Sequence, residues 1–180
     1  ENKKLKRIKK KLIYGYSKFK STNYLLEEFK KNSFPVVIIR LYQVYGEKQD
    51  LNRFIPIVID ACFKNKSFPC SDCLQKRDFI YIDDLIDALI KTMASRNGFT
   101  GPVNIGNPNE ISVNVLASKI LKLTKSKSKI VHEDLPEDDP KRRKPDISLA
   151  NEKLNWKPIF GLETGLIKTI NYFKKVNEIS

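Results

Sequence analysis

The sequence predicts an open α/β fold with a mostly parallel sheet, and three observations support this. Segments with helical periodicity alternate along the chain with short, strongly apolar segments. The run at 36–42, VVIIRLY, is apolar and β-branched at consecutive positions, as in strands covered on both faces. Of the 180 residues, 41% are hydrophobic, which suffices for one sizeable core. A helical bundle or an all-β sandwich fits this order less well.

The first predicted helix covers residues 17–31, where apolar side chains share one helical face and charged ones the other. Pro35 ends it, because proline cannot continue a helix, and the strand 36–42 follows. The remaining elements are read from the same periodicities and from capping residues. They are helices at 53–63, at 85–93 with Asp83 and Asp84 as N-cap oxygens, after the cap Ser112, after the cap Ser148 through 154, and at 162–175; strands at 103–106 and 129–132; and a loop at 133–145.

The three cysteines, Cys62, Cys70 and Cys73, are an odd number. Cys70 and Cys73 have the C-x-x-C spacing, but no second pair or nearby histidine completes a metal set. We therefore expect reduced thiols and no metal. His132, the only histidine, is expected to be an exposed strand residue, and Trp156 a core anchor.

The formal charge of +13 is concentrated in part near the start, where seven of the first eleven residues are basic. A nucleic-acid arm would interleave aromatic side chains with these cations, whereas a solvated leader needs none. We expect the leader and no nucleic-acid partner. No stretch of about 18 apolar residues and no signal-peptide core is present, which predicts a cytoplasmic protein without membrane contact.

Tyr14 and Lys18 are four residues apart, so in a helix their side chains leave the same face. A cation close to a phenol favours the phenolate and lowers the phenol pKa, which would let Tyr14 exchange a proton with a hydroxyl group near neutral pH. A surface pair without function is the commoner explanation of this spacing taken alone.

Further motifs follow in a fixed order, and with YGYSK at 14–18 they resemble the extended short-chain dehydrogenase/reductase family. Members of that family are NAD-dependent nucleotide-sugar epimerases, dehydratases and decarboxylases. The motifs are RLYQVYG at 40–46, QKRDFIYIDD at 75–84, GPVNIGN at 101–107, PEDDPKRRKPD at 136–146 and NWKP at 155–158. The tail from 136 to 158 is most similar to UDP-glucuronate decarboxylases.

The resemblance implies the C-terminal part of a Rossmann-like parallel sheet plus a smaller α/β substrate-binding region. The NAD-binding part would comprise 1–49 and 79–108, and the nucleotide-sugar region 50–78 and 109–180. The helices at 17–31 and 83–94 match those that pack across a two-fold axis in relatives, which implies a homodimer.

The resemblance also implies the cofactor contacts. Tyr14 would be the catalytic base, and Lys18 would hold the nicotinamide ribose of NAD and depress the tyrosine pKa. Leu41 and Gln43 would lie at the cofactor, with Gln43 also near the sugar. Gln43 departs from the asparagine usual in the family.

A UDP- or dTDP-linked sugar carries a diphosphate, which guanidinium groups bind through paired hydrogen bonds. Arg77 and Arg143 match the family's phosphate-binding arginines, and Asn52 and Arg53 stand where the substrate-binding helix begins. The alternatives are a loop arginine paired with Asp78, an exposed basic run at 142–143 and a plain helix start at 52–53. Ser71 and Cys73 replace the usual glycines before Arg77.

No G-x-x-G-x-x-G or G-x-G-x-x-G sequence occurs, although binding a dinucleotide pyrophosphate normally requires such a turn. We therefore expect a C-terminal portion of a longer polypeptide that is inactive by itself. The reaction, epimerisation, dehydration or decarboxylation through a transient keto-sugar, stays open. The alternative is a non-catalytic remnant that binds a nucleotide-sugar or a partner chain.

Overall fold

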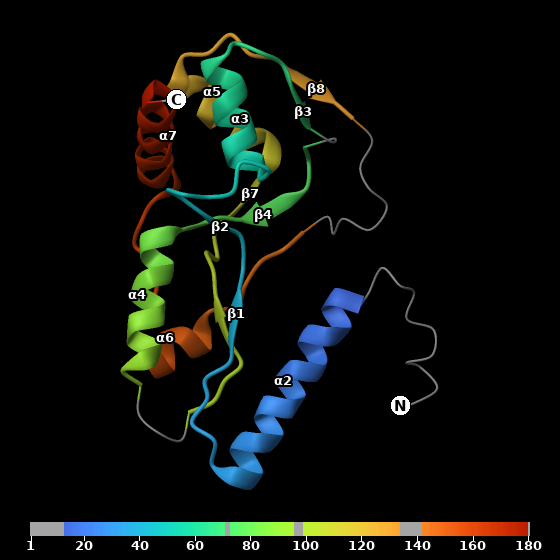
Figure 1. Ribbon diagram of the computed structural model, residues 1–180, viewed down its shortest axis with the longest axis vertical. Helices are drawn as coiled ribbons and strands as arrows, with labels where there is room; N and C mark the ends of the chain where they lie inside the picture. The colour runs from blue at the N-terminus through green and yellow to red at the C-terminus, as the bar shows by residue number, and fades with distance from the viewer. Residues whose placement is uncertain (1–12, 71–72, 96–98, 134–141, 180) are drawn as a thin grey trace.

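The protein is described here from a computed structural model, which covers residues 13–70, 73–95, 99–133 and 142–179. Figure 1 shows an elongated molecule in which helices α3, α5 and α7 gather at one end, and α2, α4 and α6 at the other. The helices are α2 (Ile13–Asn32), α3 (Phe54–Phe63), α4 (Ile82–Met93), α5 (Val113–Thr124), α6 (Ser148–Leu154) and α7 (Leu162–Ile179). The strands are β1 (Ile39–Leu41), β2 (Val44–Tyr45), β3 (Phe68–Cys70), β4 (Lys76–Asp78), β5 (Ile80–Tyr81), β6 (Val103–Ile105), β7 (Glu110–Ser112) and β8 (Ile130–His132).

The strands pair two by two, and most pairs are parallel. β1 pairs with β6, β2 with β5, and β3 with β8 in parallel, while β4 and β7 are antiparallel. Parallel pairs require crossover connections, and the connection between β2 and β5, for example, contains α3. The predicted α/β class with parallel strands is confirmed.

The buried side chains form two main cores, one at each end of the molecule in Figure 1. The first joins α4 and α6 to β6 and contains Trp156, which is fully buried as expected. The second joins α3, α5 and α7 and contains Tyr45, Phe68, Tyr81 and Leu116. Tyr81 of β5 lies in the second core while its neighbour Ile80 lies in the first, so β5 connects the two.

The strand predicted at 36–42 is shorter and less covered than expected. It is regular only over β1, where Arg40 and Leu41 are exposed. The prediction of burial on both faces is therefore wrong, and the preceding helix α2 also buries none of its residues. Among the described residues, no element packs over the exposed side chains of Arg40 and Leu41, as would be needed for a strand that is buried on both faces.

One predicted cap is confirmed and two are wrong. Ser112 caps α5, and its Oγ accepts a hydrogen bond from the Val115 N–H at 3.2 Å. Asp83 and Asp84 instead lie inside the first turn of α4, whose N-cap residue is Tyr81. Ser148 is the first residue of α6 rather than its cap. In both failed cases the polar oxygens of the predicted cap do not bind the helix's own first amides.

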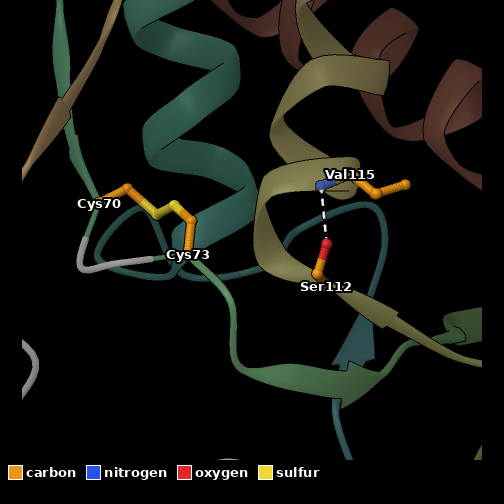
Figure 2. Close-up of a disulfide and its surroundings, with 4 residues drawn as sticks. All are labelled: Cys70, Cys73, Ser112 and Val115. Atoms are coloured by element: carbon orange, nitrogen blue, oxygen red, sulfur yellow. Dashed lines mark hydrogen bonds between the residues drawn. A yellow bond between two sulfur atoms is a disulfide. The ribbon is translucent and has the colours of Figure 1, made fainter.

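Cys70 and Cys73 form a disulfide, shown in Figure 2. The prediction of reduced thiols is wrong for these two, because the backbone places their Cα atoms 5.9 Å apart, within the range that a disulfide spans. Cys62 is free and buried.

His132 is exposed in β8, as expected. In the described ranges no group of three or more His, Cys, Asp or Glu side chains could hold a metal ion. None of the described helices combines the length and apolarity needed to cross a bilayer.

Candidate functional site

The structure brings Tyr14 and Lys18 together on α2. Because the helix begins at Ile13, both residues lie within it, and the Lys18 Nζ is 5.4 Å from the centroid of the Tyr14 ring. The Tyr14 side chain is 75% exposed, so its hydroxyl is open to a ligand. The Tyr14 phenol ring and the Lys18 ammonium therefore lie next to each other, as predicted.

A second group of predicted residues follows β1. After Leu41, the Tyr42 N–H still donates to the Ile105 carbonyl of β6 at 3.2 Å, whereas the Gln43 carbonyl accepts from the Ile80 N–H of β5 at 2.9 Å. The chain thus changes its pairing partner between these two residues. Ligands of open α/β sheets bind outside the carboxyl ends of parallel strands, at points where neighbouring strands diverge. Leu41 is 54% exposed here and Gln43 is half-buried.

The two predicted phosphate-binding arginines come from segments that lie side by side. Lys76 of β4 forms a parallel bridge with Arg142, and the Arg143 N–H donates to the Lys76 carbonyl at 3.1 Å. Arg77 is buried within β4, which makes the interpretation as a loop arginine wrong. Arg143 is exposed, while the Arg142 Nε donates to Glu110 at 2.7 Å. Arg142 thus has an acidic partner.

Asp78, the last residue of β4, is fully buried. Neither of its carboxylate oxygens makes a hydrogen bond to the described residues. Burial raises its pKa to about 6, and the nearby backbone amides of Asn107 and Gln43, together with the charge of Arg143, only partly oppose this rise. We call Asp78 and the surrounding residues Tyr42, Gln43, Gly106, Asn107, Arg143 and Pro145 the Asp78 junction.

Gly106 shows how closely the segments of the Asp78 junction approach. A Cβ atom on Gly106 would lie 2.9 Å from the Asp78 Oδ2, from Pro145 and from Tyr42. Three segments distant in the sequence therefore meet the carboxylate at one point. Only a residue without a side chain fits there without moving one of them.

Asn52 and Arg53 lie apart from these groups in the chain, in the turn before α3. The Asn52 N–H donates to the Asp50 carboxylate at 3.2 Å, and Arg53 is the N-cap residue of α3 with no capping bond from its side chain. Both side chains are exposed, and in the described part of the protein neither makes a hydrogen bond or ion pair. The helix start alone explains the local conformation.

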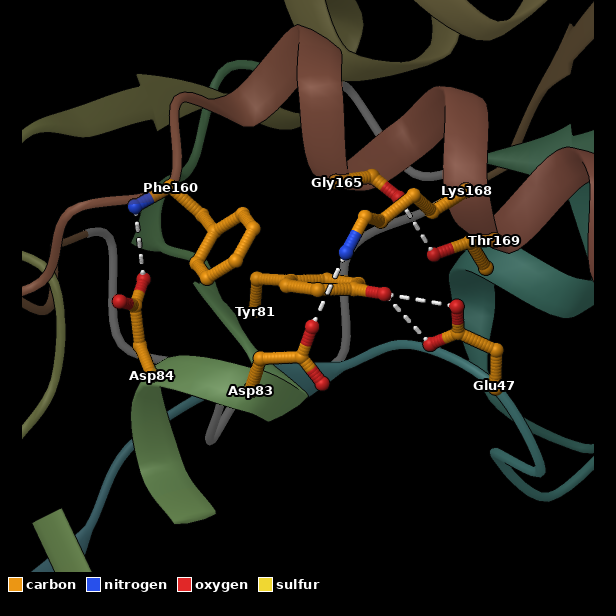
Figure 3. Close-up of polar contacts among 8 residues, drawn as sticks. All are labelled: Glu47, Tyr81, Asp83, Asp84, Phe160, Gly165, Lys168 and Thr169. Atoms are coloured by element: carbon orange, nitrogen blue, oxygen red, sulfur yellow. Dashed lines mark hydrogen bonds and ion pairs between the residues drawn. The ribbon is translucent and has the colours of Figure 1, made fainter. Parts of the chain in front are cut away.

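A further polar group, which the sequence did not predict, joins α4 to the segment before α7 (Figure 3). The buried Asp84 carboxylate accepts hydrogen bonds from the backbone amides of Ile159 at 2.8 Å and Phe160 at 3.1 Å. The Trp156 Nε1 donates to the Asp84 carbonyl at 3.1 Å. Burial raises the Asp84 pKa, and the two amides act against this rise. We call these four residues the Asp84 clamp.

Tyr81, Glu47 and Lys168 extend this group on the side facing α7 (Figure 3). The Tyr81 hydroxyl donates to both Glu47 carboxylate oxygens at 2.7 Å. The Lys168 ammonium lies 5.3 Å from the Tyr81 ring centroid and 3.1 Å from Asp83 Oδ2. These contacts fix the start of α7 against β5 and α4.

Asp78 stands in a quoted motif, but from the sequence it was considered only as a possible partner of Arg77. The signal was a carboxylate directly after an arginine within a segment of strand-forming residues, where a charge is costly to bury. Its burial becomes evident only when the segments ending at Tyr42, Gly106 and Arg143 are seen to surround it.

Comparison with known proteins gives concordant results. The NAD dependent epimerase/dehydratase family matches residues 1–106. UDP-glucuronic acid decarboxylase 1 of Xenopus tropicalis is 32% identical over 94% of this chain and 38% of its own length. UDP-glucuronic acid decarboxylase 1 of Arabidopsis thaliana is 34% identical over 77% of the chain and 32% of its length. The chain thus spans well under half of these relatives.

Solved structures agree. UDP-glucose 4-epimerase of Thermotoga maritima, determined with UDP-glucose, superposes with a TM-score of 0.85 at 26% identity, covering 91% of this chain and 54% of the epimerase. UDP-glucuronic acid 4-epimerase of Bacillus cereus, in complex with UDP-glucuronic acid and NAD, gives 0.81 at 27% identity, covering 91% and 52%.

Proposed function

Because the chain belongs to the NAD dependent epimerase/dehydratase family, we propose that the full-length protein converts a UDP-linked sugar through a transient keto-sugar, with Tyr14 as the base. The observation that carries the proposal is the position of the Lys18 ammonium, 5.4 Å from the Tyr14 ring centroid on an exposed helix face.

The residues of this chain fit the nicotinamide end of NAD. Tyr14, Lys18 and Leu41 are exposed, and Gln43 follows the carboxyl end of β1. When bound, NAD supplies an acceptor for the hydride of the sugar carbon. Tyr14 would take the hydroxyl proton of that carbon, and Lys18 would stabilise the phenolate and hold the ribose hydroxyls.

Arg77 and Arg143 would bind the diphosphate of the substrate. Their segments are joined through the bridge between Lys76 and Arg142, and two guanidinium groups on neighbouring segments suit a pair of phosphates. Asn52 and Arg53 remain candidates for the nucleotide, since their side chains are exposed and unpaired within the described residues. Uridine and glucuronate are the choices that the relatives favour.

We further propose that the protein works as a homodimer through α2 and α4. Ile86, Ile90 and Met93 form one exposed row along α4, at i, i+4 and i+7, with Met93 86% exposed. Phe19 and Tyr24 are exposed on α2. A second copy would remove these apolar side chains from water.

The test is a product assay with the full-length protein, NAD and UDP-glucuronate, read by mass spectrometry and by NMR of the sugar. Loss of carbon dioxide would identify a decarboxylase, and an inverted carbon at constant mass an epimerase. Binding of UDP-glucuronate without any conversion would favour a non-catalytic binding protein. Recovery of unbound and unchanged substrate would refute the proposal.

A further inference from the structure

Asp78 has no task in the proposed reaction, and yet it is a fully buried carboxylate without a hydrogen-bond partner among the described residues. Such a group is costly, because burial removes the hydration of the charge and the nearby amides of Asn107 and Gln43 replace that hydration only in part. In native proteins a group of this kind calls for an explanation, and its surroundings supply one.

We propose that Asp78 is a positioning residue that holds Arg143 and the backbone at Gln43 in the arrangement that binds the substrate diphosphate and sugar. The inference rests on the proposed function, since it concerns the same ligand. It adds a residue that acts through its neighbours and does not itself touch the substrate.

The geometry of the Asp78 junction supports this role. The Gln43 and Asn107 amides lie near the carboxylate, and they belong to the chain just after β1 and just after β6. Pro145 and Tyr42 lie about as close to Gly106 as the Asp78 Oδ2 does. The ends of two parallel strands and the segment that carries Arg143 thus lie around a single carboxylate.

The charges around Asp78 point the same way. On its own strand, Arg77 is the adjacent residue. Across β7, its register partner is Glu110, which is already paired with Arg142. From the segment at 142–145, Arg143 attracts the Asp78 charge and forms no ion pair with any described acidic residue. From the segment just after β1, the Tyr42 side chain lies beside Gly106. Arg143 is therefore the cation that the Asp78 charge can orient.

This arrangement makes binding sensitive to pH. The Asp78 pKa of about 6 leaves the carboxylate ionised at pH 7.5 and mostly protonated at pH 5.5. A nucleotide-sugar diphosphate keeps its charge over this range. Protonation of Asp78 should therefore release Arg143 and weaken binding as the pH falls through about 6.

The test is isothermal titration of the full-length, NAD-loaded protein with UDP-glucuronate at pH 7.5 and 5.5. Wild type should bind about threefold more weakly at pH 5.5, as expected for a group with a pKa near 6. D78N should bind about tenfold more weakly than wild type at pH 7.5 and lose the pH response, since a tenfold change corresponds to one lost charge-assisted contact. D84N is the matched control: it alters a buried carboxylate outside the junction, and its affinity and pH response should equal those of wild type.

D78N with wild-type affinity, or with the wild-type pH response, would overturn the inference and leave the proposed function intact. Wild-type protein that binds no UDP-glucuronate would overturn both. If D78N does not fold, R143A decides: its binding should be weak and independent of pH between 5.5 and 7.5. A pH response of wild-type size in R143A would show that Asp78 does not act through Arg143.

Discussion

The Asp78 junction and the Asp84 clamp each contain a buried aspartate, but among the described residues only the Asp84 carboxylate has hydrogen-bond partners. Both aspartates are buried and stand six residues apart. Asp84 accepts two backbone amides, whereas Asp78 accepts no hydrogen bond from the described residues. A satisfied buried carboxylate stabilises the fold, and an unsatisfied one indicates a site whose charge is needed for something else. Changes at the clamp should therefore alter stability, and changes at the junction or on α2 should alter binding and turnover.

The largest effect is expected from Y14F in the full-length protein. Loss of the proposed base should lower turnover by about 10² to 10⁴, the usual contribution of a general base, with little change in substrate affinity. Because Tyr14 is 75% exposed, the free energy of unfolding should not change. Y24F is the matched control, since Tyr24 is 63% exposed on the same helix. Steady-state kinetics with UDP-glucuronate measures both, and undiminished turnover of Y14F would remove the role of Tyr14 as base.

D84A should lower the free energy of unfolding by about 4 kcal/mol, because it removes two hydrogen bonds to a charged group at about 2 kcal/mol each. Urea denaturation measures this loss. The affinity of the folded fraction for UDP-glucuronate should stay unchanged. A loss of affinity with intact stability would show that the clamp and the junction are one functional unit.

The buried charge of Asp78 should itself destabilise the fold at neutral pH. Its pKa is about 6 in the folded state against 3.8 ordinarily, so the stabilising effect of the protonated form is complete below pH 3.8 and is lost as the pH rises through 6. Relative to D78N, wild type should lose about 3 kcal/mol of unfolding free energy between pH 3.5 and 7. Parallel denaturant titrations of the two proteins across this range measure the difference. Curves of equal shape would mean that Asp78 is hydrated in solution.

The disulfide between Cys70 and Cys73 precedes β4 and Asp78 along the chain. It closes a very short loop, for which the chain-entropy relation gives about 2 kcal/mol. Thermal unfolding with and without a dithiol reductant should show this loss, and the C70S/C73S variant should not respond to reductant. If reduction left the unfolding midpoint unchanged, the bond would not contribute to stability. UDP-glucuronate affinity should not change, because the residues that fix the junction follow β1 and β6.

K168A is expected to have the smallest effect. The Lys168 and Asp83 side chains are 44% and 42% exposed, and pairs of this kind contribute under about 1 kcal/mol. The contacts of Lys168 with the Tyr81 and Phe160 rings add a comparable amount at most. The loss of unfolding free energy measured by urea denaturation should therefore be clearly smaller for K168A than for D84A. Equal losses for the two variants would show that the stability of the clamp comes from α7 and not from the amides of the 159–160 segment.

The sequence predicted those features that depend on neighbours along the chain. Ser112 caps its helix because donor and acceptor are three residues apart, and Tyr14 meets Lys18 because one helical turn separates them. Asp84 was misread as a cap because its partners, Ile159 and Phe160, follow some 75 residues later. The burial of β1 was overestimated, since covering a strand depends on what packs over it and not on its own composition.

In the candidate site too, the sequence predicted single residues from local motifs but not the contacts between distant segments. Arg77 and Arg143 were found one by one through their motifs, but the bridge between their strands has no local signature. Asp78 escaped notice because its importance arises from three converging segments. The oxidation of Cys70 and Cys73 was missed because spacing alone allows both a dithiol and a disulfide.

The bare backbone of Gly106 has a practical consequence for anyone redesigning this protein. A methyl group added at this position would collide with Tyr42, Asp78 and Pro145, because an atom of each lies 2.9 Å from where its carbon would stand. Even the change from glycine to alanine would thus disturb the packing around the Asp78 carboxylate. Sequence libraries built on this scaffold should therefore keep position 106 invariant.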